Sequence, residues 1–256
     1  MGKVEAYERH TGRYAAELAN AFIPFAGVSS EMRVLDVGSG PGGLTERLAR
    51  IVGGERVAAV DPSDEFVEAC RRRVPGSDVR QGRAEELPFD DRVFDGTLSQ
   101  LVIQILSDAP AALREMVRVT RQGGVVATCV WDFREGMPLL GAFWDAARAV
   151  DPERAARAGA DDEDPWCTPE GLRRLWRDAG AKDIEQGQLE AGADYDGLDD
   201  AFFSFAAGAG TSGVFCRSLD EREQANLREE FGRRLAVPDG SFRLTARAWA
   251  IRGRVP

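Results

Sequence analysis

The 256-residue sequence is poor in the residues that most often carry acid–base, redox and metal chemistry. It contains a single histidine, His10, and four cysteines, which are Cys70, Cys129, Cys167 and Cys216. No two cysteines stand at the spacing of a redox or zinc motif, so we expect four buried thiols. The acidic run at 158–166 is typical of a solvated loop. The sequence therefore predicts no metal site.

The sequence also lacks a long apolar run and an excess of positive charge. No segment reaches the roughly 20 apolar residues that cross a bilayer, and the N-terminal segment lacks the apolar core of a signal peptide. Thirty-three Lys and Arg against 43 Asp and Glu give a formal net charge of −10, which repels nucleic acid and anionic membrane surfaces. We expect a cytoplasmic protein that binds small molecules, with neither nucleic acid nor a membrane as partner.

The first half of the sequence alternates apolar strands with amphipathic helices. Strands are expected at 33–37, 56–61, 77–82, 93–98 and 124–131, and helices at 43–53, 63–74 and 109–124. Strands that alternate with helices form parallel sheets covered on both faces. The pattern predicts an α/β fold with a doubly wound, mostly parallel sheet.

The second half is less regular. Helices are expected at 139–150, 168–180, 198–208 and 219–235, and strands at 182–191 and 241–253. The last of these alternates apolar and polar residues, which favours an edge strand and suits an antiparallel one. The segment 132–168 carries the aromatic residues Phe133, Phe143, Trp144 and Trp166. They indicate either a cap over an apolar substrate or an ordinary packed helix.

One charge stands out in the stretch "VLDVGSGPGGLT", where Asp36 lies at the end of a buried strand and four glycines follow. A carboxylate there is costly unless a cation or a hydrogen-bond donor pairs with it. Gly38, Gly40 and Gly43 satisfy G-x-G-x-x-G, which on its own suggests a dinucleotide such as NAD. A pyrophosphate at a helix N-terminus does not require the acid, so a ligand that bears an ammonium group fits better. Asp61 ends the next strand, where an acid reaches a ribose diol in nucleotide-binding units.

Four segments together carry a family resemblance. They are "VLDVGSGPG", "AAVDPS", "GRAEELPFDDRVFDGTLSQLVIQIL" and "LREMVRVTRQGGVVATCVWD", and in order and spacing they resemble the motifs of class I S-adenosylmethionine-dependent methyltransferases, particularly the ubiquinone/menaquinone biosynthesis branch. The resemblance implies a seven-stranded sheet whose last strand is antiparallel. It also implies one domain over 1–256, made of an N-terminal helical lid (1–30), a cofactor-binding core (31–131), a helical cap insertion (132–168) and a C-terminal part that completes the sheet (169–256).

The resemblance assigns roles to individual residues. Asp36 and the loop of Gly38, Ser39, Gly40 and Gly42 would meet the methionine part of the cofactor, Asp61 the ribose hydroxyls and Pro62 the adenine. Ala84 and Glu85 would contact the adenine edge, Ser99 and Gln100 would lie beneath the sulfonium, and Tyr7 and Tyr14 would line the lid. Plainer roles stay open for several of them. Asp61 is also a helix-capping residue by position, Glu85 a first-turn helix acid, and Tyr7 and Tyr14 a pair on one helix face that suits core packing.

The expected activity is methyl transfer from S-adenosylmethionine to a small molecule by in-line displacement. The acceptor atom, oxygen, nitrogen, sulfur or carbon, and the oligomeric state are not encoded in any pattern of the sequence. An NAD-dependent oxidoreductase and a non-catalytic regulatory protein that binds S-adenosylmethionine are the alternatives.

His10 is the one histidine available as a general base. Related enzymes often have a histidine in the stretch that corresponds to "LVIQIL", where this chain has Gln104 and Ile105. We therefore expect alignment of the reactants to dominate, and His10→Ala to leave the rate of methyl transfer nearly unchanged in single-turnover measurements. Loss of a positioned base typically costs on the order of 10²–10⁴ in rate. A drop of about 100-fold or more with unchanged cofactor affinity would make His10 the base.

Overall fold

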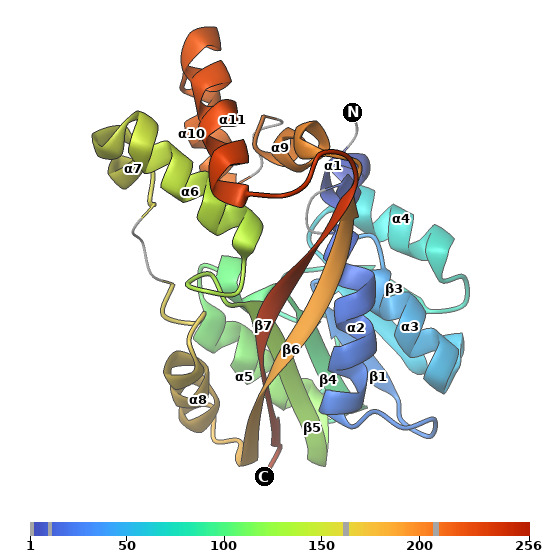
Figure 1. The fold of residues 1–256 in the computed structure, drawn as a ribbon. Helices are drawn as coiled ribbons and strands as arrows, with labels where there is room; N and C mark the ends of the chain where they lie inside the picture. The colour runs from blue at the N-terminus through green and yellow to red at the C-terminus, as the bar shows by residue number, and fades with distance from the viewer. Residues whose placement is uncertain (1–2, 10–11, 161–163, 207–209) are drawn as a thin grey trace. The chain divides into compact units, whose positions relative to one another are not determined.

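The computed structural model describes residues 3–9, 12–160, 164–206 and 210–256 (Figure 1). His10 lies outside these ranges, so its role stays a prediction. Contacts divide the chain into two compact units. We call residues 15–131, 164–191 and 248–256 the sheet unit, and residues 1–14, 132–163 and 192–247 the helical unit. One boundary, between Trp131 and Asp132, coincides with the start of the predicted insertion.

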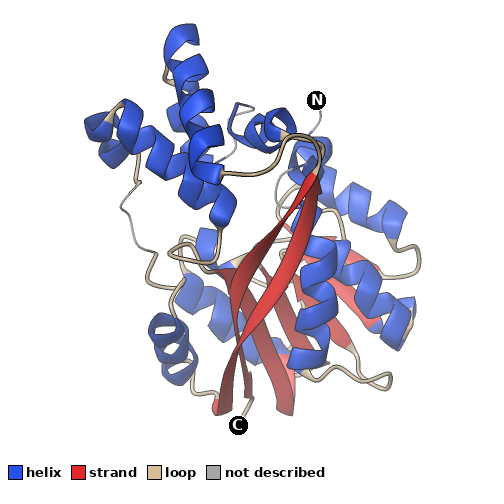
Figure 2. Cartoon of the chain, viewed as in Figure 1, coloured by secondary structure: helices blue, strands red, loops and turns tan. Residues whose placement is uncertain are grey.

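The sheet has seven strands in the order β3-β2-β1-β4-β5-β7-β6 (Figure 2). The strands are β1 (Val34–Val37), β2 (Val57–Asp61), β3 (Asp78–Gln81), β4 (Phe94–Gln100), β5 (Thr120–Trp131), β6 (Lys182–Tyr195) and β7 (Phe242–Arg254). The pairs β1–β2, β1–β4, β2–β3 and β4–β5 are parallel, and β5–β7 is antiparallel. The predicted doubly wound, mostly parallel sheet with an antiparallel last strand is confirmed.

Helices cover both faces of the sheet within the sheet unit. Those with residues in this unit are α2 (Gly12–Ala26), α3 (Gly43–Val52), α4 (Asp64–Arg73), α5 (Ala109–Val119) and α8 (Pro169–Asp178). Helices α2, α3 and α4 lie on one face and α5 and α8 on the other (Figure 1). Each buries an apolar stripe, as Leu44 and Leu48 do on α3 and Leu113 and Met116 do on α5. The four cysteines are buried thiols, as predicted.

The end of one helix and the place of one strand in the sheet correct the sequence prediction. The helix expected at 109–124 ends at Val119, because Thr120 already pairs with Phe94 and begins β5. Strand β7 was expected at a sheet edge but lies between β5 and β6, so β6 is the edge strand. Alternation of apolar and polar residues shows only that one face of a strand is buried, and it does not show whether the strand lies at an edge. Ala246, Ala248 and Ala250 form the buried face of β7 inside the sheet.

The helical unit has its own aromatic core. Its helices are α1 (Lys3–Arg9), α6 (Pro138–Val150), α7 (Pro152–Arg157), α9 (Leu198–Ala206), α10 (Gly210–Arg217) and α11 (Glu221–Leu235), with the first turn of α2. Phe143 of α6 packs against Trp144, Phe205 and Phe215, with ring centroids 4.1 to 6.1 Å apart. Phe143 and Trp144 are therefore core residues, and the packed-helix interpretation holds for them. Phe133 is 40% exposed, and Trp166 packs in the sheet unit.

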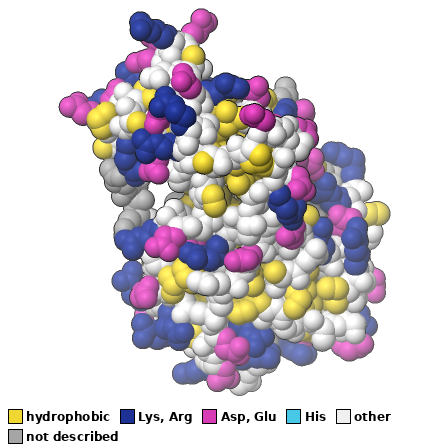
Figure 3. Space-filling view, viewed as in Figure 1, with side chains coloured by type: hydrophobic (Ala, Val, Ile, Leu, Met, Phe, Trp, Pro, Cys, Tyr) yellow, Lys and Arg dark blue, Asp and Glu magenta, His cyan; other side chains and the backbone are white. Residues whose placement is uncertain are grey.

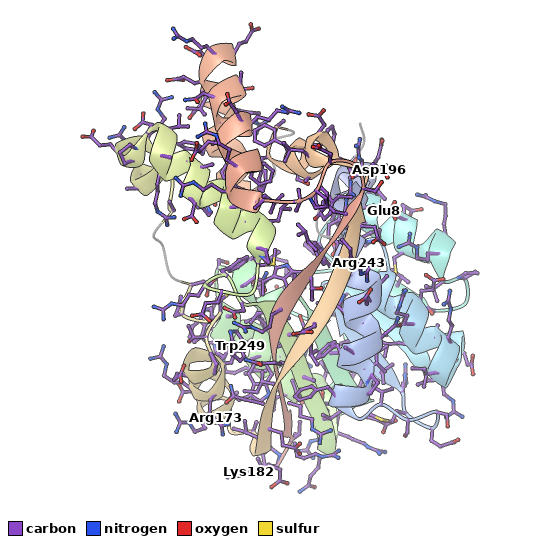
Figure 4. The ribbon with its side chains drawn as sticks, in the orientation of Figure 1. Glu8, Arg173, Lys182, Asp196, Arg243 and Trp249 are labelled. Atoms are coloured by element: carbon purple, nitrogen blue, oxygen red, sulfur yellow. The ribbon has the colours of Figure 1, made fainter. Side chains whose placement is uncertain are left out.

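Ion pairs join the segments within each unit. In the helical unit, Arg13 Nη1 donates to Asp200 Oδ2 at 2.7 Å, and Arg247 Nε donates to the buried Asp132 at 2.8 Å. Figure 4 shows Arg243 on β7 in this unit, where it pairs with Asp194 at 2.9 Å. Acidic and basic side chains alternate over the face drawn in Figure 3 without forming a field of one sign.

The described ranges contain neither a membrane-spanning helix nor a cluster of metal ligands. No described helix is long and apolar enough to cross a bilayer. The described residues also include no group of three or more His, Cys, Asp or Glu side chains arranged to hold a metal ion.

Helix α8 begins at the predicted cap, where the Thr168 hydroxyl accepts from the N–H of Gly171 at 3.1 Å. Thr168→Ala removes this acceptor and should lower the free energy of unfolding by about 1 kcal/mol. Thr168→Ser keeps the hydroxyl and should stay within about 0.5 kcal/mol of the wild type. Urea unfolding followed by tryptophan fluorescence measures both, because Trp176 lies on the same helix. Equal losses in the two variants would contradict the assigned cap.

Candidate functional site

The candidate site lies at the carboxyl ends of β1, β2 and β4, where open α/β sheets bind ligands. Strand β1 is buried along its whole length, and Asp36 within it is 1% exposed. The chain then turns through Gly38 and Gly40, whose φ angles are +74° and +53°. Side chains with a Cβ rarely adopt this region. The glycines therefore permit the tight turn that the sequence predicted.

The glycine loop is closely packed from beneath. A Cβ on Gly38 would clash with a methyl carbon of Val102, which follows β4. A Cβ on Gly42, where φ is +94°, would stand 2.9 Å from the Cys70 sulfur on α4. Both positions therefore exclude larger residues on steric grounds as well as by conformation.

The N–H groups of this loop point into the protein. Those of Gly38 and Ser39 donate to the carbonyl of Val60, that of Gly40 to Asp61, and that of Gly42 to the carbonyl of Ser39. A pyrophosphate bound at such a loop relies on N–H groups that face the ligand. These four N–H groups are therefore not free to bind a dinucleotide pyrophosphate, which weakens the NAD interpretation.

Asp36 itself occupies the anion position at the N-terminus of α3. Its carboxylate accepts from the Thr45 hydroxyl at 2.6 Å and interacts with the backbone N–H of the same residue. Burial nevertheless raises the pKa of Asp36 to about 7, and the nearby Asp61 carboxylate adds to the rise while Thr45 opposes it. No Lys or Arg side chain of the described ranges bonds to Asp36. The group is half-ionised near neutral pH and is stabilised by any ligand that brings positive charge.

Asp61 links the glycine loop to the end of β2. Its Oδ2 accepts from the N–H of Gly40 at 2.9 Å, and its Oδ1 accepts from the N–H of Ser63 at 2.9 Å. Ser63 occupies the N-cap position of α4, although its side chain makes no cap bond. Asp61 thus both steadies the helix start, as the capping alternative held, and positions Gly40. Pro62 beside it is exposed.

Ala84 and Glu85 lie in a turn between β3 and β4. Residues Arg83 and Glu86 form an isolated antiparallel bridge around them. Glu85 is therefore not a first-turn helix acid, and that alternative is wrong. Its carboxylate pairs with Arg83 at 3.3 Å, and Ser107 donates to it at 3.4 Å. Ala84 is buried.

Ser99 and Gln100 end β4, and each has a buried side-chain oxygen without a hydrogen-bond partner among the described residues. These atoms are Ser99 Oγ and Gln100 Oε1. Strand alternation puts the two side chains on opposite faces. Gln100 Nε2 donates to the carbonyl of Ala15 on α2 at 3.0 Å, which fixes its amide. The Ser99 carbonyl accepts from the Thr128 hydroxyl at 2.7 Å.

Leu101 follows with a φ of +63°, which is strained for a bulky residue. Such strain persists where the surrounding structure enforces it, and it concentrates at functional sites. Here the turn directs the chain away from β4, so that Val102 reaches Gly38. No sequence pattern signalled this strain.

The two predicted lid residues, Tyr7 and Tyr14, lie in the helical unit. Tyr14 is buried, and its hydroxyl is 3.0 Å from that of Tyr195. Burial raises the pKa of Tyr14 and that of Tyr195. This contact supports a packing role for Tyr14, and a role of either residue toward the cofactor stays a prediction.

Sequence reasoning also missed three supports of the site, Thr45, Cys70 and Val102. Thr45 and Cys70 fall on the buried faces of α3 and α4 and looked like ordinary core positions. A signal was nevertheless present for Thr45, because a hydroxyl on the buried face of the helix that follows the loop is placed to donate to a carboxylate at the end of β1.

The residues fit a ligand that is rich in donors and positively charged. Asp36 lacks a cationic partner among the described residues, the loop N–H groups are satisfied internally, and Gln100 Oε1 is a buried acceptor with no described donor. An ammonium group supplies both the positive charge and the N–H donors that the Asp36 carboxylate lacks. The amino-acid end of S-adenosylmethionine has this chemistry.

Comparison with known proteins agrees with this fit. Residues 35–128 match the model of a methyltransferase domain family. An uncharacterized methyltransferase of Mycobacterium tuberculosis is 37% identical over 132 residues, which are 52% of this chain and 51% of that protein. The chain thus spans about half the length of the first curated relatives it matches. The demethylmenaquinone methyltransferase of Roseiflexus castenholzii is 31% identical over 185 residues, 68% of this chain and 77% of that protein.

Solved structures share the fold. A phosphoethanolamine N-methyltransferase from Haemonchus contortus, solved with phosphomonomethylethanolamine and S-adenosylhomocysteine, aligns with a TM-score of 0.59 at 17% identity. The alignment covers 99% of this chain and 57% of that one. From the sheet, the glycine loop and these relatives together it follows that the chain belongs to the class I S-adenosylmethionine-dependent methyltransferases.

Proposed function

We propose that this protein transfers the methyl group of S-adenosylmethionine to a small-molecule acceptor. The observation that carries the proposal is the buried Asp36 carboxylate, which has no cationic partner among the described residues. A buried carboxylate of this kind is unfavourable, because the hydrogen bonds that the described residues give it offset only part of its lost hydration. A cationic ligand would offset the remainder.

In this proposal, different residues bind different parts of the cofactor. Asp36 and the loop of Gly38, Ser39, Gly40 and Gly42 would hold the amino-acid end. Asp61 would hold the ribose, and Pro62, Ala84 and Glu85 would surround the adenine. Ser99 and Gln100 would lie beneath the reacting end. When bound, the cofactor supplies an already activated methyl group on a sulfonium.

The protein's own contribution is alignment and exclusion of water. An in-line displacement is accelerated chiefly by holding the acceptor atom, the methyl carbon and the sulfur in one line. Gln104 cannot take a proton from the acceptor, and its Oε1 accepts from the N–H of Trp131 at 3.3 Å. The proposed mechanism therefore uses an acceptor that is already nucleophilic, or one that loses its proton to a carboxylate, a tyrosine or water.

The acceptor we propose is small and apolar or aromatic. The formal net charge of −10 disfavours nucleic acid and an anionic membrane surface. One relative is named for demethylmenaquinone, which supports an apolar aromatic ring as the class to test first. The side chain of Ile105, in the segment that follows β4, is 75% exposed and therefore presents apolar surface near the end of that strand.

Cofactor choice is tested by thermal shift. A ligand at 100 times its dissociation constant adds about 2.7 kcal/mol, which raises Tm by several degrees at roughly 2–4 °C per kcal/mol. We expect this rise with S-adenosylmethionine or S-adenosylhomocysteine and none with NAD. The reverse pattern would overturn the proposal. Mass spectrometry of a metabolite pool incubated with the protein and S-adenosylmethionine should then show a product heavier by one methyl group, whereas binding without product would indicate a regulatory protein.

Asp61→Ala tests the ribose contact and the tie to Gly40. Loss of hydrogen bonds to a charged group should weaken S-adenosylhomocysteine binding by about 1.5–3 kcal/mol, as measured by calorimetry, with the fold retained by circular dichroism. Asp64→Ala is the matched control, because Asp64 is an exposed acid in the first turn of α4. Unchanged affinity in Asp61→Ala would restrict Asp61 to its part in the helix start.

A further inference from the structure

Thr45 is a buried polar residue outside the set of proposed cofactor contacts. It lies on the first turn of α3 with no exposed surface, and its hydroxyl donates to Asp36 Oδ2 at 2.6 Å. A hydroxyl that donates to a carboxylate favours the ionised form of that carboxylate. Thr45 therefore acts on the charge of Asp36 and not only on its position.

A second group orients the Thr45 hydroxyl. The Cys70 thiol on α4 donates to Thr45 Oγ1 at 3.6 Å. Because the thiol donates to this oxygen, the hydroxyl proton is left for the carboxylate. Cys70 also lies directly beneath Gly42, so the same side chain supports the loop. Donation thus runs in one direction, from Cys70 through Thr45 to Asp36.

The other groups that face Asp36 do not hold it ionised. Asp61, at the end of β2, repels a second negative charge. Burial raises the pKa of the Cys70 thiol, so it is neutral and contributes no charge. Within the described ranges no arginine or lysine bonds to Asp36. The ionised form depends on the Thr45 hydroxyl and on the backbone N–H at the start of α3.

We propose that Thr45, oriented by Cys70, is the positioning residue that keeps Asp36 ionised and turned toward the ammonium group of the cofactor. This inference rests on the proposed function, because it assigns Asp36 to a cationic ligand. It predicts that the hydroxyl matters most at low pH, where Asp36 tends to be protonated, and matters little once Asp36 is fully ionised.

Thr45→Val removes the hydroxyl at nearly constant shape, and Thr45→Ser keeps it. A rise of one pKa unit in Asp36 is tenfold in the ionised fraction below the pKa. For such a rise, S-adenosylhomocysteine should bind Thr45→Val about tenfold more weakly than wild type at pH 6 and about twofold more weakly at pH 8. Ionisation of the ligand itself affects the wild type and Thr45→Val equally, so it cancels in the ratio of their affinities at each pH. Thr45→Ser should follow the wild type at both pH values.

A ligand without the ammonium group separates charge from shape. 5′-Methylthioadenosine lacks the amino-acid part, so its affinity should be equal in the wild type and Thr45→Val at each pH. A ratio for S-adenosylhomocysteine that does not vary with pH, or an equal loss for both ligands, would overturn the proposal and leave Thr45 a packing residue.

The ligand-free protein gives an independent readout. The folded-state pKa of Asp36, about 7, exceeds its ordinary value of 3.8. The folded state thus binds more protons than the unfolded state between these values, and stability falls as pH rises through the window. Asp36→Asn removes this dependence, so its Tm minus that of the wild type should be larger at pH 8 than at pH 5. In Thr45→Val the fall should extend to higher pH than in the wild type.

These measurements distinguish the two proposals. If wild type and Thr45→Val lose stability over the same pH range, Thr45 does not govern the charge of Asp36, whatever the ligand. If the stability curves differ as expected but the wild type binds neither S-adenosylmethionine nor S-adenosylhomocysteine, the proposed function fails and the assignment of Asp36 to an ammonium group fails with it.

Discussion

The buried carboxylate of Asp36 is the constraint around which the rest of the site is arranged. A carboxylate 1% exposed inside a parallel sheet is unfavourable, and the fold compensates it only in part. The Thr45 hydroxyl and the N-terminus of α3 supply donors, yet the pKa of Asp36 stays near 7. The remaining cost lowers the stability of the ligand-free protein, and the proposed cationic ligand would offset it.

The surrounding loops share this bias toward positive, donor-rich ligands. The same glycine pattern that binds pyrophosphate in dinucleotide enzymes here turns its N–H groups inward, to Val60, Ser39 and Asp61. Asp36 takes the anion position at the helix start, so the helix dipole is already used within the protein. The helix start that such a loop offers to an anionic ligand is here filled by a carboxylate of the protein itself.

Much of the sheet and the position of Asp36 could be predicted from local sequence, because strand period and glycine placement are local properties. Local sequence does not determine which strands lie beside a given strand. The alternation of apolar and polar residues in β7 would be the same at an edge of the sheet as between β5 and β6. The same limit applies to side chains. The sequence left Phe143 and Trp144 open between a substrate cap and a packed helix, because the residues that pack against them, Phe205 and Phe215, are distant in sequence. The bond from Gln100 to Ala15 likewise joins segments that no local pattern relates.

The place of β7 between β5 and β6 also has a consequence for how the chain folds as it is made. Synthesis delivers β5 and then β6 before the strand that must separate them exists. Until β7 emerges, β5 has one edge with unpaired N–H and carbonyl groups, and β6 has no partner in the sheet. Open edges of this kind invite pairing with other chains. The final strand of the sheet therefore pairs with β5 and β6 at once, and the interval before it arrives leaves both strands open to pairing with other chains.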